Sequence, residues 1–138
     1  MNSTENTAAL VGRLLLSLLF VMGGWGKLMA PAATQAMLAK HNLPMVEAGW
    51  LLAVIVELGG GLAILFGLFA RPVGFVCAIW CVATALIGHA DFADRNQEIH
   101  FLKNMGLTGG FLYIAAFGAG AWSLDASLWH RRGVVPAE

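Results

Sequence analysis

Long apolar segments separated by short polar stretches dominate the hydrophobic pattern of this chain. Four of them run from about 8 to 29, 48 to 69, 72 to 89 and 103 to 124. Each is close to the roughly 17–25 residues that a transmembrane helix needs. None has the continuous polar stripe that the outward face of a soluble bundle helix would show. The pattern therefore predicts an all-α integral membrane protein, a four-transmembrane-helix bundle.

The connections between these segments differ in length and polarity. The first loop is long enough for a short helix from Pro31 to about Lys40, which the Asn42-Leu43-Pro44 sequence would end. The third loop, residues 90–102, is the most charged part of the chain. We expect one membrane domain over residues 8–126, flanked by a flexible N-terminal segment (1–7) and a flexible C-terminal tail (127–138).

Composition supports a membrane protein. Of the 138 residues, 59% are hydrophobic and only 12% are charged, whereas soluble domains are about half apolar and about one quarter charged. The net charge is zero, which argues against a nucleic-acid partner. Cys77 and Cys81 lie four residues apart within an apolar run. That is poor geometry for a disulfide, so we interpret them as packing residues, with a redox pair as the alternative.

Four spans would place both termini on one side of the membrane, with the first and third loops on the other. Basic residues divide equally between the two sides, but Lys27 and Lys103 could lie within the bundle. Without them the balance favours cytoplasmic termini. The residues counted are Arg13, Arg71, Arg131 and Arg132 on the termini side, and Lys27, Lys40, Arg95 and Lys103 on the loop side.

Glu57 is the one charged residue in the stretch from Ala48 to Ala70. A carboxylate near the centre of a span costs about 2.5–3.5 kcal/mol on insertion scales. The chain must therefore supply a partner, water or a proton. Glu57 lies roughly 14 Å from the loop end of its helix, within the range of basic side chains that enter from that end.

The loop-side end of the predicted bundle concentrates the ionisable groups. We predict that Glu57, Lys27 and His89 are catalytic, with Glu57 exchanging a proton and His89 relaying it to water. Lys103, Asn104, Arg13 and Glu98 are the predicted substrate-binding residues. The simpler alternatives are lysines that only reach the lipid headgroups, and a Glu57–Lys ion pair that fixes helix packing.

No motif indicates an intrinsic metal, haem or flavin. The histidines lack the H-x-x-x-H or Cys–His spacing of a metal site, and there is no C-x-x-C-H motif and no Rossmann glycine pattern. We interpret Gly59-Gly60-Gly61 as a packing feature, because no strand precedes it. The tryptophans near the predicted helix ends indicate an aromatic belt: Trp25, Trp50, Trp122 and Trp129.

Several short motifs, taken in order, resemble the DoxX family of small four-helix bacterial membrane proteins. The resemblance covers about residues 8–126 and implies a location in the bacterial inner membrane. It also implies a role as a membrane partner in quinone-linked oxidoreductase or oxidative-stress complexes. The motifs are Arg13-Leu14-Leu15-Leu16, Gly24 to Lys27, Glu57 to Gly61, Gly67 to Arg71, His89, Glu98, Leu102-Lys103-Asn104 and Ser123-Leu124-Asp125.

The leading functional hypothesis is therefore a membrane subunit of an oxidoreductase system, with a polar loop-side pocket around Glu57. The pocket would bind a quinone or a small redox substrate, and electrons would pass through that ligand or a partner subunit. One alternative is a proton-coupled binding or transport protein, which with only four helices would form a homo-oligomer. The other is a non-catalytic structural subunit.

Overall fold

The computed structural model describes residues 2–131, and every regular element in this range is helical. The prediction of an all-α protein is confirmed. The short helix expected in the first loop is present with the predicted bounds. The elements in chain order are α1 (Ser3–Met29), α2 (Pro31–Lys40), α3 (Val46–Val54), the π-helical turn η1 (Ile55–Gly59), α4 (Gly60–Phe66), α5 (Ala70–Gly88), α6 (Arg95–Phe117) and α7 (Leu124–Arg131).

Three helices in the described range are long and apolar enough to cross a membrane. They are α1, the continuous helix α3–η1–α4 (Val46–Phe66), and α5. The fourth long helix, α6, has 23 residues, but its first turns are strongly polar and it does not reach the same hydropathy. The structure thus shows a helical protein with three candidate spans. The fourth predicted span, α6, is not apolar enough to be identified as a membrane span from its composition.

The ends of two helices differ from the prediction. Helix α6 begins at Arg95, well before residue 103, because the Asp94 side chain accepts a hydrogen bond from the Asn96 amide at 2.8 Å. It ends before Gly118, whose φ of 85° is left-handed backbone that favours glycine. Helix α1 begins at Ser3 because Asn2 and Glu5 form a capping box. Leu124–Arg131, at the start of the expected tail, forms α7, and residues 132–138 lie outside the described range.

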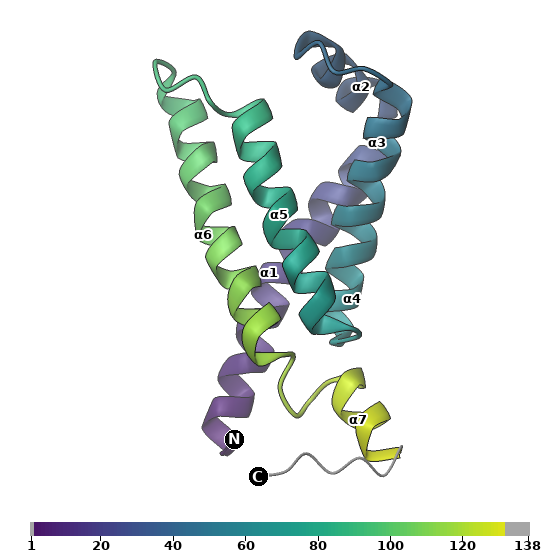
Figure 1. The fold of residues 1–138 in the computed structure, drawn as a ribbon, viewed down its shortest axis with the longest axis vertical. Coiled ribbons are helices and arrows are strands. Elements are labelled where there is room, and N and C mark those ends of the chain that lie inside the picture. Colours follow the sequence, from purple (N-terminus) through teal and green to yellow (C-terminus); the bar gives the residue numbers. More distant parts are fainter. Residues whose placement is uncertain (1, 132–138) are drawn as a thin grey trace.

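The helices form two arms that converge at one end and diverge at the other (Figure 1). One arm is α1 with α2, α3, η1 and α4, and the other is the α5–α6 hairpin. They converge at the termini side, where α1 begins and α7 lies, and they diverge toward the loop side, where α2 and the α5–α6 connection lie. The two arms therefore form a V-shaped arrangement of helices (Figure 1).

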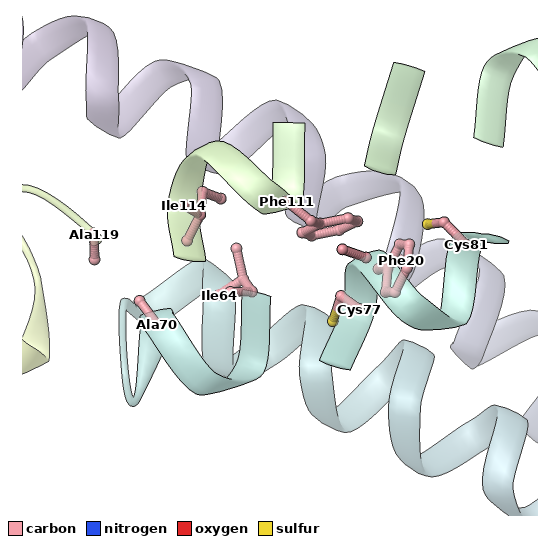
Figure 2. Close-up of a cluster of buried hydrophobic side chains, with 9 residues drawn as sticks. Phe20, Ile64, Ala70, Cys77, Cys81, Phe111, Ile114 and Ala119 are labelled. Atoms are coloured by element: carbon pink, nitrogen blue, oxygen red, sulfur yellow. The ribbon is translucent and has the colours of Figure 1, made fainter. Parts of the chain in front are cut away.

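The buried core joins the two arms at the convergent end and in the middle (Figure 2). Phe20 of α1 contacts Phe111 of α6 edge to face, with ring centroids 4.5 Å apart, a favourable aromatic geometry. Ile64 and Cys77 are also fully buried in this cluster. Cys77 and Cys81 are both free and buried, so they are not a disulfide and pack in the core as predicted.

Close contact between α1 and the second span depends on glycine. A Cβ atom on Gly24 would overlap the backbone of Leu58, which belongs to η1. Small residues of this kind let membrane helices approach backbone to backbone. The contact brings α1 directly against the turn that carries Glu57.

Candidate functional site

Glu57 is the central residue of the π-helical turn η1. A π-turn widens one turn of an α-helix by a residue, and such turns occur frequently at functional sites. Of the three consecutive glycines 59–61, Gly59 ends this turn, and Gly60 and Gly61 begin α4. The sequence predicted a regular helix here. The turn was missed because the segment around it is apolar on all sides, so the extra residue of a wide turn disturbs no visible periodicity.

Lys27 of α1 pairs with this carboxylate. Its Nζ donates to Glu57 Oε2 at 2.6 Å, the short distance of a charge-assisted hydrogen bond. Gly23, one turn earlier on α1, leaves the space that the pair occupies, since a Cβ there would lie 2.9 Å from the same oxygen. The structure thus brings together two of the three residues predicted to be catalytic.

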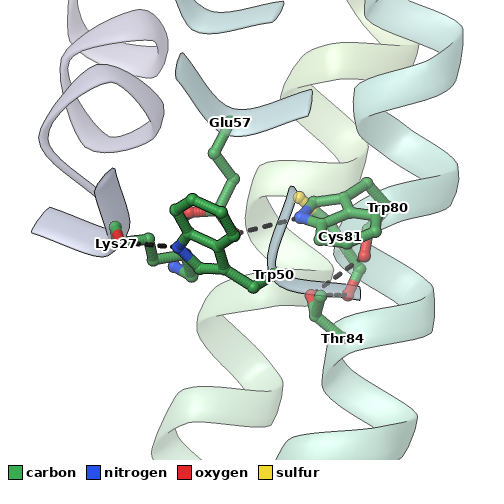
Figure 3. Close-up of polar contacts among 6 residues, drawn as sticks. All are labelled: Lys27, Trp50, Glu57, Trp80, Cys81 and Thr84. Atoms are coloured by element: carbon green, nitrogen blue, oxygen red, sulfur yellow. Dashed lines mark hydrogen bonds and ion pairs between the residues drawn. The ribbon is translucent and has the colours of Figure 1, made fainter. Parts of the chain in front are cut away.

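Trp80 of α5 completes the site from the other arm (Figure 3). Its indole Nε1 donates to Glu57 Oε1 at 3.1 Å, so each carboxylate oxygen has a donor from a different helix. Trp80 was not among the site residues predicted from the sequence. The signal was an indole N–H in the middle of an apolar segment, where it needs an acceptor. We call Lys27, Glu57 and Trp80 the mid-span cluster.

Trp50, which the sequence assigned to an aromatic belt, supports this cluster through the backbone of Lys27. Its Nε1 donates to the backbone carbonyl of Lys27 at 2.8 Å, as Figure 3 shows. The bond ties the last turn of α1 to α3. It fixes the point from which the Lys27 side chain extends toward η1.

The mid-span cluster is only partly covered by protein. The side chain of Lys27 is 27% exposed and that of Glu57 is 13% exposed. Both carboxylate oxygens therefore have hydrogen-bond donors, yet the side chain of Glu57 is not fully buried.

His89 lies apart from this cluster. It follows α5 and is nine residues beyond Trp80, about 13 Å along the helix axis. Its Nδ1 lies 2.7 Å from Gln97 Oε1, and its ring stacks on His100 with centroids 4.9 Å apart. The histidine pair links the ends of α5 and α6 at the loop side and does not contact Glu57.

The predicted binding residues on α6 do not converge on Glu57 either. Glu98 pairs with Arg95 at 3.0 Å on the exposed first turn. The Asn104 carbonyl accepts the Thr108 hydroxyl at 2.8 Å within α6. Lys103 is exposed, and its side chain makes no ion pair or hydrogen bond with residues 2–131, the range that the structure describes.

Arg13 belongs to a second polar cluster at the opposite end of the molecule. It is 4% exposed and donates to the carbonyls of Ala119 and Trp122, both at 2.8 Å. Both acceptors lie in the segment between α6 and α7. The guanidinium therefore holds the C-terminal segment against α1.

Asp125 of α7 contributes the other half of this second cluster. Its two carboxylate oxygens accept the backbone amides of Phe69 and Ala70 at 2.8 Å each. Its own amide donates to Gly67 O at 2.9 Å. Gly67 has a φ of 66° and no room for a side chain beside Arg13. We call Arg13, Asp125 and the backbone groups that they bind the termini-side cluster.

Among the residues that the structure describes, histidine, cysteine and acidic side chains form no group of three that could hold a metal ion. The chemistry of the mid-span cluster is that of one carboxylate, one ammonium and one indole donor. These groups can bind acceptors and exchange protons.

Comparison with known proteins identifies the family. The sequence model of the DoxX family matches residues 8–90. The chain is 38% identical to inner membrane protein YqjF of Escherichia coli (strain K12) over 130 residues, which is 93% of this chain and 97% of the relative. It is 33% identical to inner membrane protein YphA of the same organism over 122 residues, or 84% and 86% of the two chains. No solved structure matches the chain. The chain is thus an inner-membrane protein and belongs to the DoxX family.

Proposed function

We propose that this protein is a membrane subunit of an oxidoreductase system, and that it binds a quinone or a small redox substrate at the mid-span cluster. The observation that carries the proposal is the geometry of Glu57. Its carboxylate lies in mid-span on a π-turn, holds one donor on each oxygen, and is partly exposed. Intramembrane ionisable residues of this kind commonly mark ligand or proton sites.

A quinone headgroup suits the donors of this site. Each of its two carbonyl oxygens is an acceptor, and Lys27 Nζ and Trp80 Nε1 are donors that can transfer from the carboxylate to a ligand. When the bound quinol is oxidised, it loses two protons and two electrons. Glu57 accepts one proton, water at the loop side takes the other, and both electrons pass to the redox group of a partner subunit.

We propose further that α6 is the fourth span and that the termini are cytoplasmic. Helix α6 has 23 residues and pairs with α5 along its length (Figure 1). The start of α1 and α7 lie at the same end, as an even number of crossings requires. Cysteines introduced at Ser3 and Ala93 test this topology. An impermeant thiol reagent added to intact cells should label position 93 and spare position 3, and the reverse would overturn the orientation.

Quinone titration of the purified protein in detergent tests the binding function. Wild type should bind a short-chain ubiquinone analogue saturably. Lys27→Met should weaken that binding by about tenfold or more, because a charge-assisted hydrogen bond contributes about 1.5–3 kcal/mol. The matched control is Arg95→Gln, which removes an ion pair that is exposed on α6 and should leave the affinity unchanged.

Two outcomes would contradict the proposal. Equal quinone affinity in wild type and Lys27→Met would leave the ion pair a structural feature of helix packing. Absence of saturable quinone binding in folded wild-type protein would remove the quinone site itself.

A further inference from the structure

The hydrogen bond from Trp80 to Glu57 joins the two arms of the molecule. Trp80 belongs to the α5–α6 hairpin, whereas Glu57 and Lys27 belong to the other arm. On the termini side of this bond, the arms share the buried core that includes Phe20 and Phe111. Trp80 itself packs against the edge of that core.

On the loop side of Trp80, the polar contacts of α5 stay within its own arm. The Thr84 hydroxyl bonds to the carbonyls of Trp80 and Cys81 in the same helix. A Cβ on Gly88 would meet no atom within 4 Å. His89 contacts Gln97 and His100 of α6. Among the residues that the structure describes, the Trp80–Glu57 bond is the side-chain hydrogen bond between the arms that lies nearest the loop side. At their loop-side ends, α2 and the α5–α6 connection, the two arms diverge (Figure 1).

We infer that Trp80 is a gating residue, whose indole N–H holds the arms together at Glu57 and whose release lets them separate to admit a ligand headgroup from the loop side. The choice of a quinone as that ligand rests on the proposed function. The broader chemical class of the ligand follows from the Trp80–Glu57 hydrogen bond. A group that replaces the Glu57 carboxylate must offer the indole an acceptor oxygen, as a carbonyl or an anionic oxygen does.

The rest of the structure provides a pivot for this movement. The termini-side cluster and the buried core hold the arms together at one end, so rotation about that end opens the other. Hinge movements of this kind need only a few residues to change conformation. Loss of one hydrogen bond to a carboxylate shifts a two-state equilibrium by about tenfold or more.

Distances between spin labels in lipid nanodiscs test the inference directly, without any quinone. One label at Lys40, the end of α2, and one at Ala93, between α5 and α6, report the separation of the arms at the loop side; both positions are exposed. The native thiols Cys77 and Cys81 are buried and should not label. Trp80→Phe should give a longer and broader distance distribution than wild type.

The matched control is Trp25→Phe, because Trp25 lies on the outward side of α1 and is 56% exposed. It should reproduce the wild-type distances. Glu57→Gln retains an acceptor oxygen for the indole and should stay near wild type, whereas Glu57→Leu should follow Trp80→Phe. If Trp80→Phe does not fold, the distance distribution of Glu57→Leu tests the same hydrogen bond.

Distributions for Trp80→Phe and Glu57→Leu that superimpose on wild type would overturn the gating role. Quinone binding is measured separately, so a gate that operates without quinone affinity would refute only the proposed function, and quinone affinity with immobile arms would refute only the gate.

Discussion

The two polar clusters of this membrane protein have the same kinds of charged group but bind them in different ways. In the termini-side cluster, Arg13 and Asp125 hydrogen-bond to backbone carbonyls and amides. In the mid-span cluster, Glu57 bonds to the side chains of Lys27 and Trp80. Arg13 of the termini-side cluster is buried, whereas Lys27 and Glu57 of the mid-span cluster are partly exposed.

This difference indicates different roles. Backbone groups cannot leave their positions without unfolding a turn or a helix end, so side chains that bind them stabilise the fold. Side-chain donors can rotate away from the carboxylate and bind the acceptor oxygens of a ligand at little cost to the helices. The termini-side cluster should therefore respond to mutation mainly with a loss of stability, and the mid-span cluster mainly with a loss of binding.

The largest effect on stability is expected for Arg13→Ala. It removes two charge-assisted hydrogen bonds and leaves two carbonyls without their donor, for a loss of about 3 kcal/mol or more in the free energy of unfolding. Denaturant titration of the protein in detergent measures this. Arg13→Lys, which retains the charge and one donor group, should recover part of the loss. An unchanged midpoint for Arg13→Ala would show that the buried guanidinium does not hold the C-terminal segment.

Gly24→Ala should have the next largest effect, because its new methyl group would overlap the Leu58 backbone. Overpacking of this kind costs about 1–3 kcal/mol, and it would displace η1 from α1. Gly12→Ala is the matched control on the same helix, since a Cβ there meets no atom within 4 Å. Equal unfolding midpoints for Gly24→Ala and Gly12→Ala would contradict the close contact between Gly24 and Leu58.

Asp125→Ala removes the carboxylate that caps the first amides of α5. Loss of such a cap costs about 1 kcal/mol, and up to about 2 kcal/mol. Thermal unfolding in detergent should show the lower stability, with quinone affinity measured below the transition unchanged. Asp125→Asn retains an acceptor on one oxygen, so its unfolding temperature should lie between those of wild type and Asp125→Ala.

Lys27→Met should have the smallest effect on stability, because the Glu57 side chain is partly exposed and keeps the hydrogen bond that Trp80 donates when Lys27 is lost. Its unfolding midpoint should stay close to that of wild type while its ligand affinity falls. A large loss of stability would instead indicate that the pair serves helix packing.

Much of the fold could be predicted from hydrophobic pattern alone, because long apolar segments have few stable alternatives in a bilayer. Pro31 and Lys40 bound α2 as predicted. The ends of α6 could not be predicted from hydropathy, since the cap at Asp94 and the left-handed Gly118 set them locally. Residues 95–98, which are all polar, form the first turn of this helix.

A basic partner for Glu57 could be predicted because a mid-span charge requires compensation, but the sequence left it open between Lys27 and Lys103, and the structure shows that it is Lys27. Trp80 could not be predicted, since nothing in the sequence specifies which face of α5 meets Glu57. The π-turn was equally hidden, because one wide turn leaves the apolar pattern intact. Arg13 was predicted to bind substrate, but it binds carbonyls of a segment more than one hundred residues away in the chain. Only the tertiary structure brings these groups together.

The most direct test of the central claim is to measure quinone affinity and unfolding midpoint together for Lys27→Met and Asp125→Ala. We expect Lys27→Met to lose about tenfold or more in affinity with a near-wild-type midpoint, and Asp125→Ala to lose stability with wild-type affinity. If the two variants lose affinity equally, or if Lys27→Met loses only stability, the two clusters do not differ in role and the mid-span cluster is not the ligand site.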